Sequence, residues 1–580
     1  MMMLRVKGLH VSVLLLSVLT AFSQQGSDRI QLNQVGFVPS ASKIAVVTGK
    51  TGESQFFIKA NGTTYFTGTL SEERQSKNSS TVTRIADFSA FKREGVYQLS
   101  VPGVGTSYQF RIDKDVFSEV SKAVLKAFYY MRSDMPLEKA YAGKWARSAG
   151  HADTAVPIHA SAASDKRPAG TIISSSRGWY DAGDYNKYVV NSGITMATLL
   201  SAYEDFPGYF DKINTNIPES SDSVPDILNE VLYNLRWMLT MQDPNDGGVY
   251  HKLTNAAFDG MVAPGVTKAP RYVVQKSTAA ALDFAAVMAQ ASRILASFKK
   301  QLPHLADSCL LAANKAWVWA GENPSVLYDQ RGNNQKFEPG ITTGEYGDRS
   351  VNDEWFWAAT ELFATTKDSK FRTVINERMK DRASLSGWNN VTMLGYYTFI
   401  RNENNISSSS SLIQSMKDTV LRFANLCLTN QASNAFGTVI GGSQREFVWG
   451  SNSIAANQGV LLIYAYKISK DKKYTDAALS NLDYLLGRNA TNYCFVTGIG
   501  TKSPMHPHHR PSVSDNIVEP VPGMLVGGPN PGQQDHCAYP FKEPETSYVD
   551  SDCAYAANEI AINWNAPMVY LTNALRVLLK

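Results

Sequence analysis

The chain of 580 residues is longer than one hydrophobic core usually organises, so more than one domain is expected. Hydrophobic residues at 44% and charged residues at 19% exclude a disordered chain. A formal net charge of +4 is too small for this length to indicate a nucleic-acid-binding protein.

The first residues are typical of a secretory signal peptide. Arg5 and Lys7 precede an apolar run from Val11 to Phe22, which ends in small residues and is too short to cross a bilayer. No cysteine directly follows the run to carry a lipid. We therefore expect a signal peptide over residues 1–23, a mature chain beginning at Gln24, and export to the periplasm or the medium without a membrane anchor.

Five segments between residues 30 and 112 are rich in β-branched and aromatic residues, and Gly and Asn separate them at intervals of about 8–12 residues. This spacing favours an all-β sandwich, and its length fits one immunoglobulin-like domain, which we assign to residues 28–113. The predicted strands cover 43–48, 54–59, 63–68, 96–101 and 107–112.

From residue 115 onward the hydrophobic period becomes that of helices. Between residues 224 and 238, apolar residues recur at i, i+3, i+4 and i+7. Many such runs of similar length, separated by long loops, predict a mainly α-helical toroid over residues 115–580 with its chemistry on the loops. The other predicted helices cover 116–131, 191–205, 278–297, 304–320, 353–366, 411–428, 453–470, 473–486 and 553–577.

Two loops carry notable carboxylates. Asp181 and Asp184 flank a small Ala-Gly pair, which fits either an ordinary turn or a carboxylate pair held for catalysis. Asp550 precedes Glu559, which opens the last predicted helix and alone would fit a charge at a helix N-terminus. Hydrolysis of a glycosidic bond requires such a set, because one carboxyl protonates the departing oxygen while another activates water from the opposite face.

A third loop, residues 503–510, holds three histidines and an arginine within five positions. Metal ligation, a structural network and contact with a substrate are all open for these histidines, although Pro507 stiffens the loop and no HExxH spacing exists. Arg510 supplies fixed donors for sugar hydroxyls or for a carboxylate.

Asp353 and Glu354 form a further acidic cluster at the start of a predicted helix. They fit either calcium ligands or ordinary N-terminal helix charges. The five cysteines are widely spaced without a CxxC pair, so we expect buried free thiols for most of them, with a disulfide among the last three left open. They are Cys309, Cys427, Cys494, Cys537 and Cys553.

Several short motifs along the chain together resemble glycoside hydrolase family 9, which contains many secreted endoglucanases, often with a preceding immunoglobulin-like domain. Their order and spacing are specific, and they cover nearly the whole mature chain. The motifs are Ile30–Phe37, Ala127–Arg132, Tyr180–Asp184, Pro225–Glu230, Gly247–Lys252, Leu486–Asn489, Phe495–Gly498, Pro507–Arg510, Pro522–Asn530 and Tyr548–Ala566.

The resemblance implies a multi-domain, mainly α fold, in which a small β-sandwich precedes an (α/α)6 barrel with an open cleft across one end. By this resemblance Asp184 matches the general base, Asp181 helps to hold the water, and Glu559 matches the general acid. His508 matches the active-site histidine, and Asp550 the second acidic residue of the terminal motif.

The resemblance also implies substrate and metal contacts. His251, Tyr346, Trp388 and Arg510 fall where members of the family touch sugar, and Trp564 stands where some members have Tyr. Asp353 and Glu354 fall where many members hold a structural calcium. The stretch at residues 132–134 lacks the cysteine that often binds zinc, so zinc is not expected, and no organic cofactor is implied.

We therefore expect a secreted, monomeric, inverting hydrolase that cleaves internal β-1,4-glucosidic bonds of cellulose or related β-glucans, with no nucleic-acid partner. Its two carboxyl groups would stand about 6.5–9.5 Å apart. The alternative is action on xyloglucan, mixed-linkage glucan or cellodextrins, for which cleavage from a chain end is also open. A remote alternative is a non-catalytic glucan-binding protein, against which the intact Asp181, Asp184 and Glu559 argue.

Overall fold

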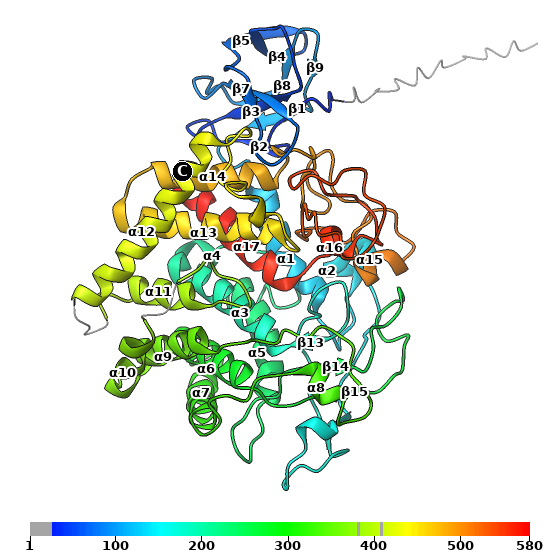
Figure 1. Cartoon of the computed structure of the whole chain (residues 1–580), viewed down its shortest axis with the longest axis vertical. Helices are drawn as coiled ribbons and strands as arrows, with labels where there is room; N and C mark the ends of the chain where they lie inside the picture. The colour runs from blue at the N-terminus through cyan, green and yellow to red at the C-terminus, as the bar shows by residue number, and fades with distance from the viewer. Residues whose placement is uncertain (1–25, 380–382, 406–409) are drawn as a thin grey trace, which may run out of the picture.

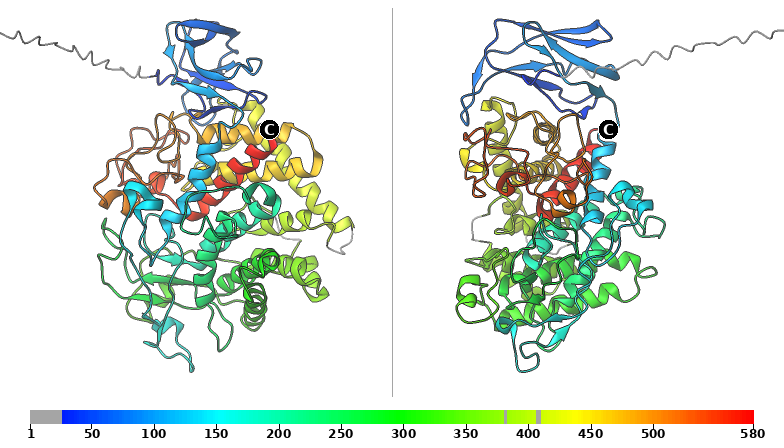
Figure 2. Two further views of the ribbon diagram at one scale, coloured as in Figure 1. Left: turned by 180° about the vertical axis from the view of Figure 1, so that it is seen from behind. Right: turned by 90° about the vertical axis from the view of Figure 1, so that its right-hand side faces the viewer.

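The computed structural model describes residues 26–379, 383–405 and 410–580. A β-rich domain stands at one end of a larger helical domain (Figure 1), and the views from behind and from the side show the same arrangement (Figure 2). The predicted signal peptide, residues 1–23, lies outside the described residues.

The N-terminal domain is a sandwich of two mainly antiparallel sheets, as the strand spacing predicts. One sheet has the order β1-β3-β7-β6 and the other β2-β10-β8-β4-β5, with β9 paired to β8. Aromatic rings fill the core between the sheets, where Phe37 makes edge-on contacts with Phe88 and Phe110. The strands are β1 (Ile30–Gln31), β2 (Gly36–Phe37), β3 (Ile44–Thr48), β4 (Gln55–Ala60), β5 (Thr63–Thr69), β6 (Arg74–Gln75), β7 (Val82–Asp87), β8 (Gly95–Val101), β9 (Gly105–Thr106) and β10 (Phe110–Ile112).

In the described part of the chain, six inner helices form a ring and six outer helices cover it, which is the (α/α)6 barrel. The inner helices are α3 (Val189–Asp205), α6 (Thr278–Leu295), α9 (Asn352–Thr366), α11 (Thr392–Arg401), α13 (Ser451–Ser469) and α17 (Ile562–Leu578). The outer helices are α1 (Ser118–Met131), α5 (Asp226–Thr240), α7 (Leu305–Glu322), α10 (Ser369–Arg378), α12 (Ser410–Ser433) and α14 (Lys473–Leu485).

Short elements lie in the loops between these helices. They are α2 (Lys139–Ala142), α4 (Pro207–Phe210), α8 (Gln330–Asn334), α15 (Arg510–Ser514), α16 (Tyr555–Asn558), β11 (Val156–Pro157), β12 (Ile172–Ile173), β13 (Lys187–Tyr188), β14 (Lys252–Asn255) and β15 (Arg271–Val273).

The inner helices are apolar on all sides because neighbours surround them. All of α6 except Arg293 is buried, and its alanines allow close packing. By length and composition this segment, Thr278–Phe298, would suffice to cross a membrane, but 89% of its apolar window is buried inside the barrel. Between α11 and α13 the ring is closed by Tyr397 and Tyr464, whose rings stack with centroids 3.9 Å apart.

The two ends of the barrel differ. Glu204 and Asp205 at the C-terminus of α3 form buried ion pairs with Arg293 of α6, Arg401 of α11 and Lys467 of α13. A helix of 17 residues is about 25 Å long. This charged floor therefore lies far from the N-terminus of α3, where the aspartate loop is found.

The last predicted helix is interrupted, which corrects the expectation that Glu559 opens it. Residues 559–561 are extended between α16 and α17, because their backbone pairs with three other loops. Glu559 pairs with His508, Ile560 with Val526, and Ala561 with Ala182.

The β-sandwich contacts the barrel at loops that lead to the candidate site. Oε1 of Gln34 accepts the backbone N–H groups of residues 501 and 502 at 2.9 and 2.8 Å. The N–H of Ser80 donates to Oε1 of Glu543 at 2.9 Å. These loops continue directly into the histidine loop and the carboxylate-rich loop, so the sandwich braces both.

Candidate active site

A cavity of about 770 Å³ opens at the N-terminal ends of the inner helices. The positive ends of the helix dipoles point toward it, which suits the carboxylates that it contains. Its lining includes most of the residues that the sequence singles out, although they are up to about 380 positions apart in the chain. They are Asp181, Asp184, Tyr346, Trp388, His508, Arg510, Glu559 and Trp564.

Asp181 is held on both of its carboxylate oxygens. Nδ2 of Asn191 donates to Oδ1 at 2.5 Å, and the hydroxyl of Tyr346 donates to Oδ2 at 2.7 Å. Burial, followed by the charge of Asp184, raises the pKa of Asp181 to about 8. Asp181 is thus a fixed carboxyl group whose ionisation is opposed by burial and by Asp184.

Asp184 is bonded on one oxygen only. Nδ2 of Asn186 and the hydroxyl of Tyr188 donate to Oδ2 at 2.5 and 3.1 Å. No described residue donates to Oδ1, and the side chain lines the cavity. This oxygen is therefore available to accept a proton from a water molecule in the cleft.

Glu559 lies against the same turn. The N–H of Gly183 donates to its Oε1 at 3.3 Å, and a Cβ atom at residue 183 would stand 2.3 Å from the carbonyl oxygen of His508. Only glycine allows this close approach. Burial, and then the charges of Asp184 and Asp181, raise the pKa of Glu559 well above its ordinary value, which suits a proton donor.

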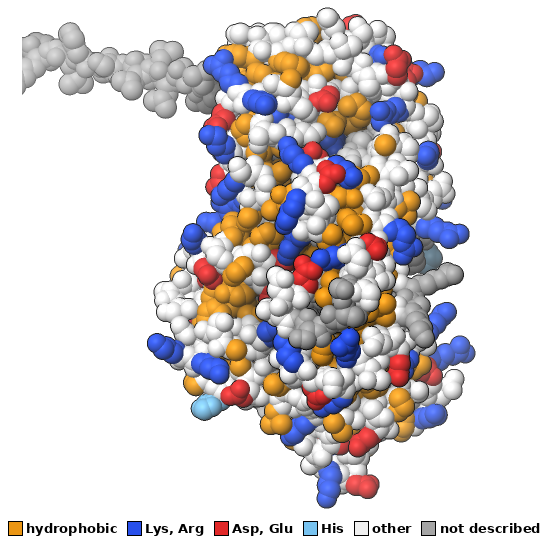
Figure 3. Space-filling view, turned by 90° about the vertical axis from the view of Figure 1, so that its left-hand side faces the viewer, with side chains coloured by type: hydrophobic (Ala, Val, Ile, Leu, Met, Phe, Trp, Pro, Cys, Tyr) orange, Lys and Arg blue, Asp and Glu red, His pale blue; other side chains and the backbone are white. Residues whose placement is uncertain are grey.

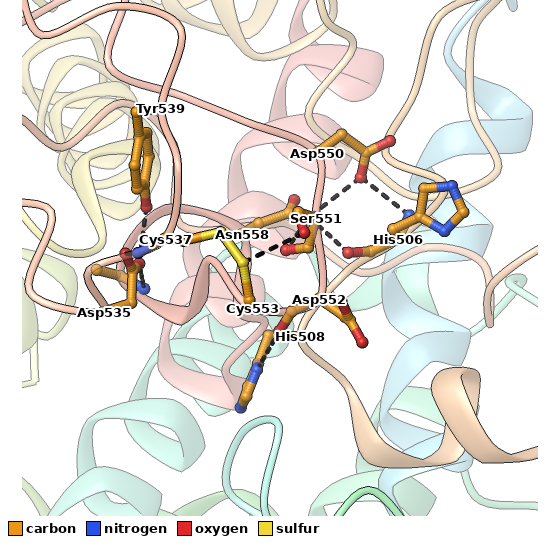
Figure 4. Close-up of a disulfide and its surroundings, with 11 residues drawn as sticks. His506, His508, Asp535, Cys537, Tyr539, Asp550, Ser551, Asp552, Cys553 and Asn558 are labelled. Carbon is orange, nitrogen blue, oxygen red and sulfur yellow. Dashed lines mark hydrogen bonds between the residues drawn. A yellow bond between two sulfur atoms is a disulfide. The ribbon is translucent and has the colours of Figure 1, made fainter.

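His508 and Arg510 complete the centre of the cleft. Nδ1 of His508 donates to the carbonyl oxygen of Asp552 at 2.6 Å (Figure 4), which leaves Nε2 as the acceptor, while burial lowers the pKa of the ring. Nη1 of Arg510 donates to the carbonyl oxygen of Gly183 at 2.7 Å. Arg510 therefore fixes the catalytic turn from behind.

Aromatic rings line the cleft beyond the carboxylates. Trp388 meets Tyr346 edge-on with centroids 5.3 Å apart, and Trp449 lies 5.3 Å from Tyr555. Trp449 is 42% exposed and Trp564 is nearly buried. The half-exposed rings offer flat apolar surfaces on which sugar rings stack.

Two predicted site residues do not line the cleft. The expected contact of His251 with sugar is corrected, because the ring is only 1% exposed and both nitrogens are bonded, to Ser277 at 2.8 Å and to the carbonyl oxygen of Glu345 at 2.9 Å. Burial lowers the pKa of His251 to about 3, so it is a neutral support behind the wall formed by residues 342–346.

Asp550 lies behind the histidine loop. It accepts the backbone N–H groups of Met505 and His506 at 2.7 and 2.9 Å and a bond from Asn558 at 3.1 Å (Figure 4). The predicted catalytic role of Asp550 is therefore corrected. Its carboxylate positions the site, because it holds together the two loops that present His508 and Glu559.

Five residues of the site were not singled out in the sequence. Asn186, Tyr188 and Asn191 closely follow the aspartate loop, so their spacing was an available signal for hydrogen-bond partners of the carboxylates. Trp449 lies in the loop before α13 and Tyr555 is the first residue of α16, and no local pattern distinguishes them from core aromatics.

A disulfide joins Cys537 to Cys553 beside His508 (Figure 4), so the pairing left open among the last three cysteines is found. The predicted buried thiols are confirmed for Cys309, Cys427 and Cys494. The carboxylate of Asp535 accepts the N–H of Cys537 at 3.0 Å and that of Ala556 at 2.8 Å. The disulfide loop is thus attached to α16, directly before Glu559.

A second acidic cluster surrounds Asp353 and Glu354. Both oxygens of Glu354 and both of Asp283 are buried without a described hydrogen-bond partner, and Asp348 has one such oxygen. Burial and mutual repulsion raise the pKa of Asp283 and of Glu354 well above the ordinary range. An all-oxygen donor set of this kind fits calcium. The described residues contain no ready-made group of three or more His, Cys, Asp or Glu side chains for a metal, so calcium remains a proposal.

The fold and the site define a glycoside hydrolase, with carboxyl groups gathered in one cleft of an (α/α)6 barrel. Residues 117–572 match the model of glycosyl hydrolase family 9, and residues 25–106 match that of the cellulase N-terminal ig-like domain. The chain belongs to glycosyl hydrolase family 9, and the resemblance seen in the sequence is confirmed.

Similar proteins agree with this assignment. The chain is 47% identical over 95% of its length to a xyloglucan-specific endo-beta-1,4-glucanase of Bacteroides ovatus, of which 94% is covered. It is 35% identical over 94% of its length to endoglucanase D of Acetivibrio thermocellus, with 83% of that protein covered. The solved structure of a Bacteroides ovatus family 9 protein superposes with a TM-score of 0.91 at 46% identity, covering 95% of this chain and all of the other.

Proposed function

We propose that the chain is an endo-β-1,4-glucanase that inverts the anomeric centre by single displacement. Protonated Glu559 gives its proton to the glycosidic oxygen as the bond to the anomeric carbon breaks. Oδ1 of Asp184 takes a proton from the water that attacks the same carbon from the opposite face. The free oxygen of Asp184, with Glu559 held against the same turn by the N–H of Gly183, carries this proposal.

The neighbouring side chains have supporting roles. Asp181 fixes the turn, because Asn191 and Tyr346 hold both of its oxygens. His508, neutral with Nε2 as an acceptor, is suited to receive a bond from a sugar hydroxyl. Trp388 and Trp449, which line the same cavity, are suited to stack on sugar rings.

The proposed substrate is a soluble β-1,4-glucan, with xyloglucan preferred. The relative of highest identity described above carries xyloglucan specificity in its name, and nearly all of both chains align. The substrate is a neutral polymer, which requires no charged surface. Basic and acidic side chains are interspersed on the face drawn in Figure 3, which is the side of α10 and α12 in Figure 1.

Activity on xyloglucan and on carboxymethyl cellulose tests the proposal, with viscosity and reducing ends followed together for wild type and Glu559→Gln. A fast loss of viscosity relative to new reducing ends, abolished in a folded Glu559→Gln, supports internal cleavage with Glu559 as the acid. Reducing ends without loss of viscosity would contradict endo action. Equal activity of both proteins would overturn the role of Glu559.

We propose calcium as a structural ion held by Asp283, Asp348, Asp353 and Glu354, where it would neutralise buried carboxylates. Calcium is expected to raise the unfolding temperature of wild type after treatment with a chelator. Glu354→Gln should remove most of this response. An unchanged unfolding temperature in wild type would contradict the site, whatever the activity.

We also propose that the mature protein is exported as a monomer. The basic residues and apolar run before residue 24 support export. Mass spectrometry of protein from the culture medium and periplasm should find Gln24 as the first residue, and retention of Met1 in the cytoplasm would contradict export.

A further inference from the structure

A second cavity, of about 380 Å³, adjoins the main cleft and is formed by the loop between β14 and β15. Phe258 lines both cavities and is 49% exposed, which is unusual for a large apolar ring. Tyr272 and Pro339 form other walls of the second cavity, and Asn255 and Thr267 add polar groups. The cavity is therefore a side chamber that shares Phe258 with the substrate cleft.

The loop that forms this chamber is tied to the catalytic turn. Nε and Nη2 of Arg510 donate to the carbonyl oxygen of Asp259 at 3.0 and 2.8 Å, while its Nη1 donates to that of Gly183 at 2.7 Å. The hydroxyl of Tyr185 donates to the carbonyl oxygen of Val262 at 2.6 Å. Gly183 and Tyr185 flank Asp184, the proposed general base. Because Arg510 joins the chamber loop to Gly183, the chamber has a fixed position next to that base.

A linear glucan in the main cleft would leave this chamber unfilled. Its volume is about half that of the main cleft, which suits a short side group better than a second polymer chain. An aromatic ring with a few polar groups around it is the usual composition of a sugar site.

We propose that this chamber, with Phe258 as its platform, binds the xylosyl branch of a backbone glucosyl unit close to the scissile bond. This inference rests on the proposed action on β-glucans and assigns the residues that select branched over unbranched chains. The xylosyl ring stacks on Phe258, and its hydroxyls meet Thr267 and Asn255 at the chamber wall.

The test compares kcat/KM on xyloglucan and on unbranched mixed-linkage β-glucan for wild type, Phe258→Ala and Phe258→Tyr. Phe258→Ala should lower kcat/KM on xyloglucan about tenfold more than on the unbranched glucan, the low end for loss of an apolar contact. Phe258→Tyr keeps the ring and should keep the preference. Phe541→Ala is the matched control, because Phe541 is 59% exposed and lies outside both cavities.

An equal loss on both substrates would overturn the branch site, because Phe258 would then serve only the backbone. Unchanged kcat/KM on both substrates in Phe258→Ala would overturn it as well. If wild type fails on xyloglucan while it cleaves unbranched glucan, the branch site is also overturned although the endoglucanase stands. Failure of wild type on every β-glucan would instead refute the proposed function itself.

Discussion

Asp181 and Asp184 are identical side chains three positions apart, and their hydrogen bonds give them different tasks. Asn191 and Tyr346 occupy both oxygens of Asp181, whereas Asp184 keeps one oxygen free toward the cleft. The sequence alone shows only a pair of aspartates in a turn. The division of labour depends on partners that follow in α3 and on a tyrosine from a distant loop.

Asp184→Asn is therefore expected to lower kcat by about 10²- to 10⁴-fold, the usual contribution of a general base. Asp181→Asn should lower kcat less, by up to about 100-fold, because it disturbs the position of the turn but leaves the base Asp184 in place. Steady-state kinetics on xyloglucan distinguish the two variants. A larger loss in Asp181→Asn than in Asp184→Asn would reverse the assignment.

Glu559 predicts a pH dependence of stability. The pKa of Glu559 is raised in the folded state above the ordinary value of about 4.3. Below that ordinary value the carboxyl group is protonated in both the folded and the unfolded chain, so its ionisation does not lower the free energy of unfolding. As the pH rises above that ordinary value, ionisation favours the unfolded state, and wild type loses free energy of unfolding until the raised pKa is passed. Glu559→Gln does not ionise and should melt at a higher temperature than wild type, by a margin that grows with pH.

Thermal melts at several pH values between about 4 and 9 check this result, a range that spans the ordinary glutamate pKa and the neutral region. The activity of wild type should fall on the alkaline side as Glu559 loses its proton. A melting difference that does not change with pH would contradict the buried, protonated state of Glu559.

At the scale of elements, the break between α16 and α17 places Glu559, the proposed acid, in the cleft. Residues 559–561 are extended because they pair with Ala182, His508 and Val526, which are distant in the chain. The local sequence favours one continuous helix there, and nonlocal backbone pairing overrides that preference. Glu559 was identified from its motif, but its backbone conformation was not predictable from neighbouring residues.

The disulfide between Cys537 and Cys553 supports this same region. Its ring spans 16 positions, for which the loss of loop entropy in the unfolded chain contributes about 3 kcal/mol. Cys537→Ser with Cys553→Ser should lower the unfolding temperature and kcat, because the Asp552 carbonyl that orients His508 lies next to the bridge.

A reductant should have the same effect on wild type and none on the double variant, because the other three cysteines are free thiols. Thermal melts and kinetics with and without reductant measure both effects. Full reduction of wild type, shown by a thiol assay, with unchanged melting and kcat would contradict the supporting role.

At the scale of the whole molecule, hydrophobic period predicts the two domains well. Period-two strands and period-3.6 helices separate the sandwich from the barrel near residue 113, and the long loops indicate where the chemistry lies. Neither the hydrophobic period nor a family motif predicts which side chains of a loop face the cleft. His251 and Asp550 lie in motifs of the family yet support the site from behind, because their polar atoms are already bonded inside the protein.

The contact between the two domains should also influence catalysis. Gln34 of the sandwich accepts two N–H groups of the loop that leads to His508, and Gln34→Ala leaves these buried donors unpaired at a cost of about 1–3 kcal/mol. We expect a lower unfolding temperature and a lower kcat. Gln55→Ala, an exposed glutamine on β4, is the control. Wild-type kcat in a destabilised Gln34→Ala would show that the sandwich stabilises the fold without positioning the site.

The proposed mechanism rests on a single displacement between Glu559 and Asp184, and the anomeric form of the first product reports on that step. Proton NMR during the first minutes of hydrolysis resolves the α and β anomers before mutarotation mixes them. Single displacement predicts that cleavage of a β-linked glucan releases the α anomer first. Initial release of the β anomer would mean a covalent intermediate and a double displacement, and would contradict the assignment of Asp184 as a base acting on water.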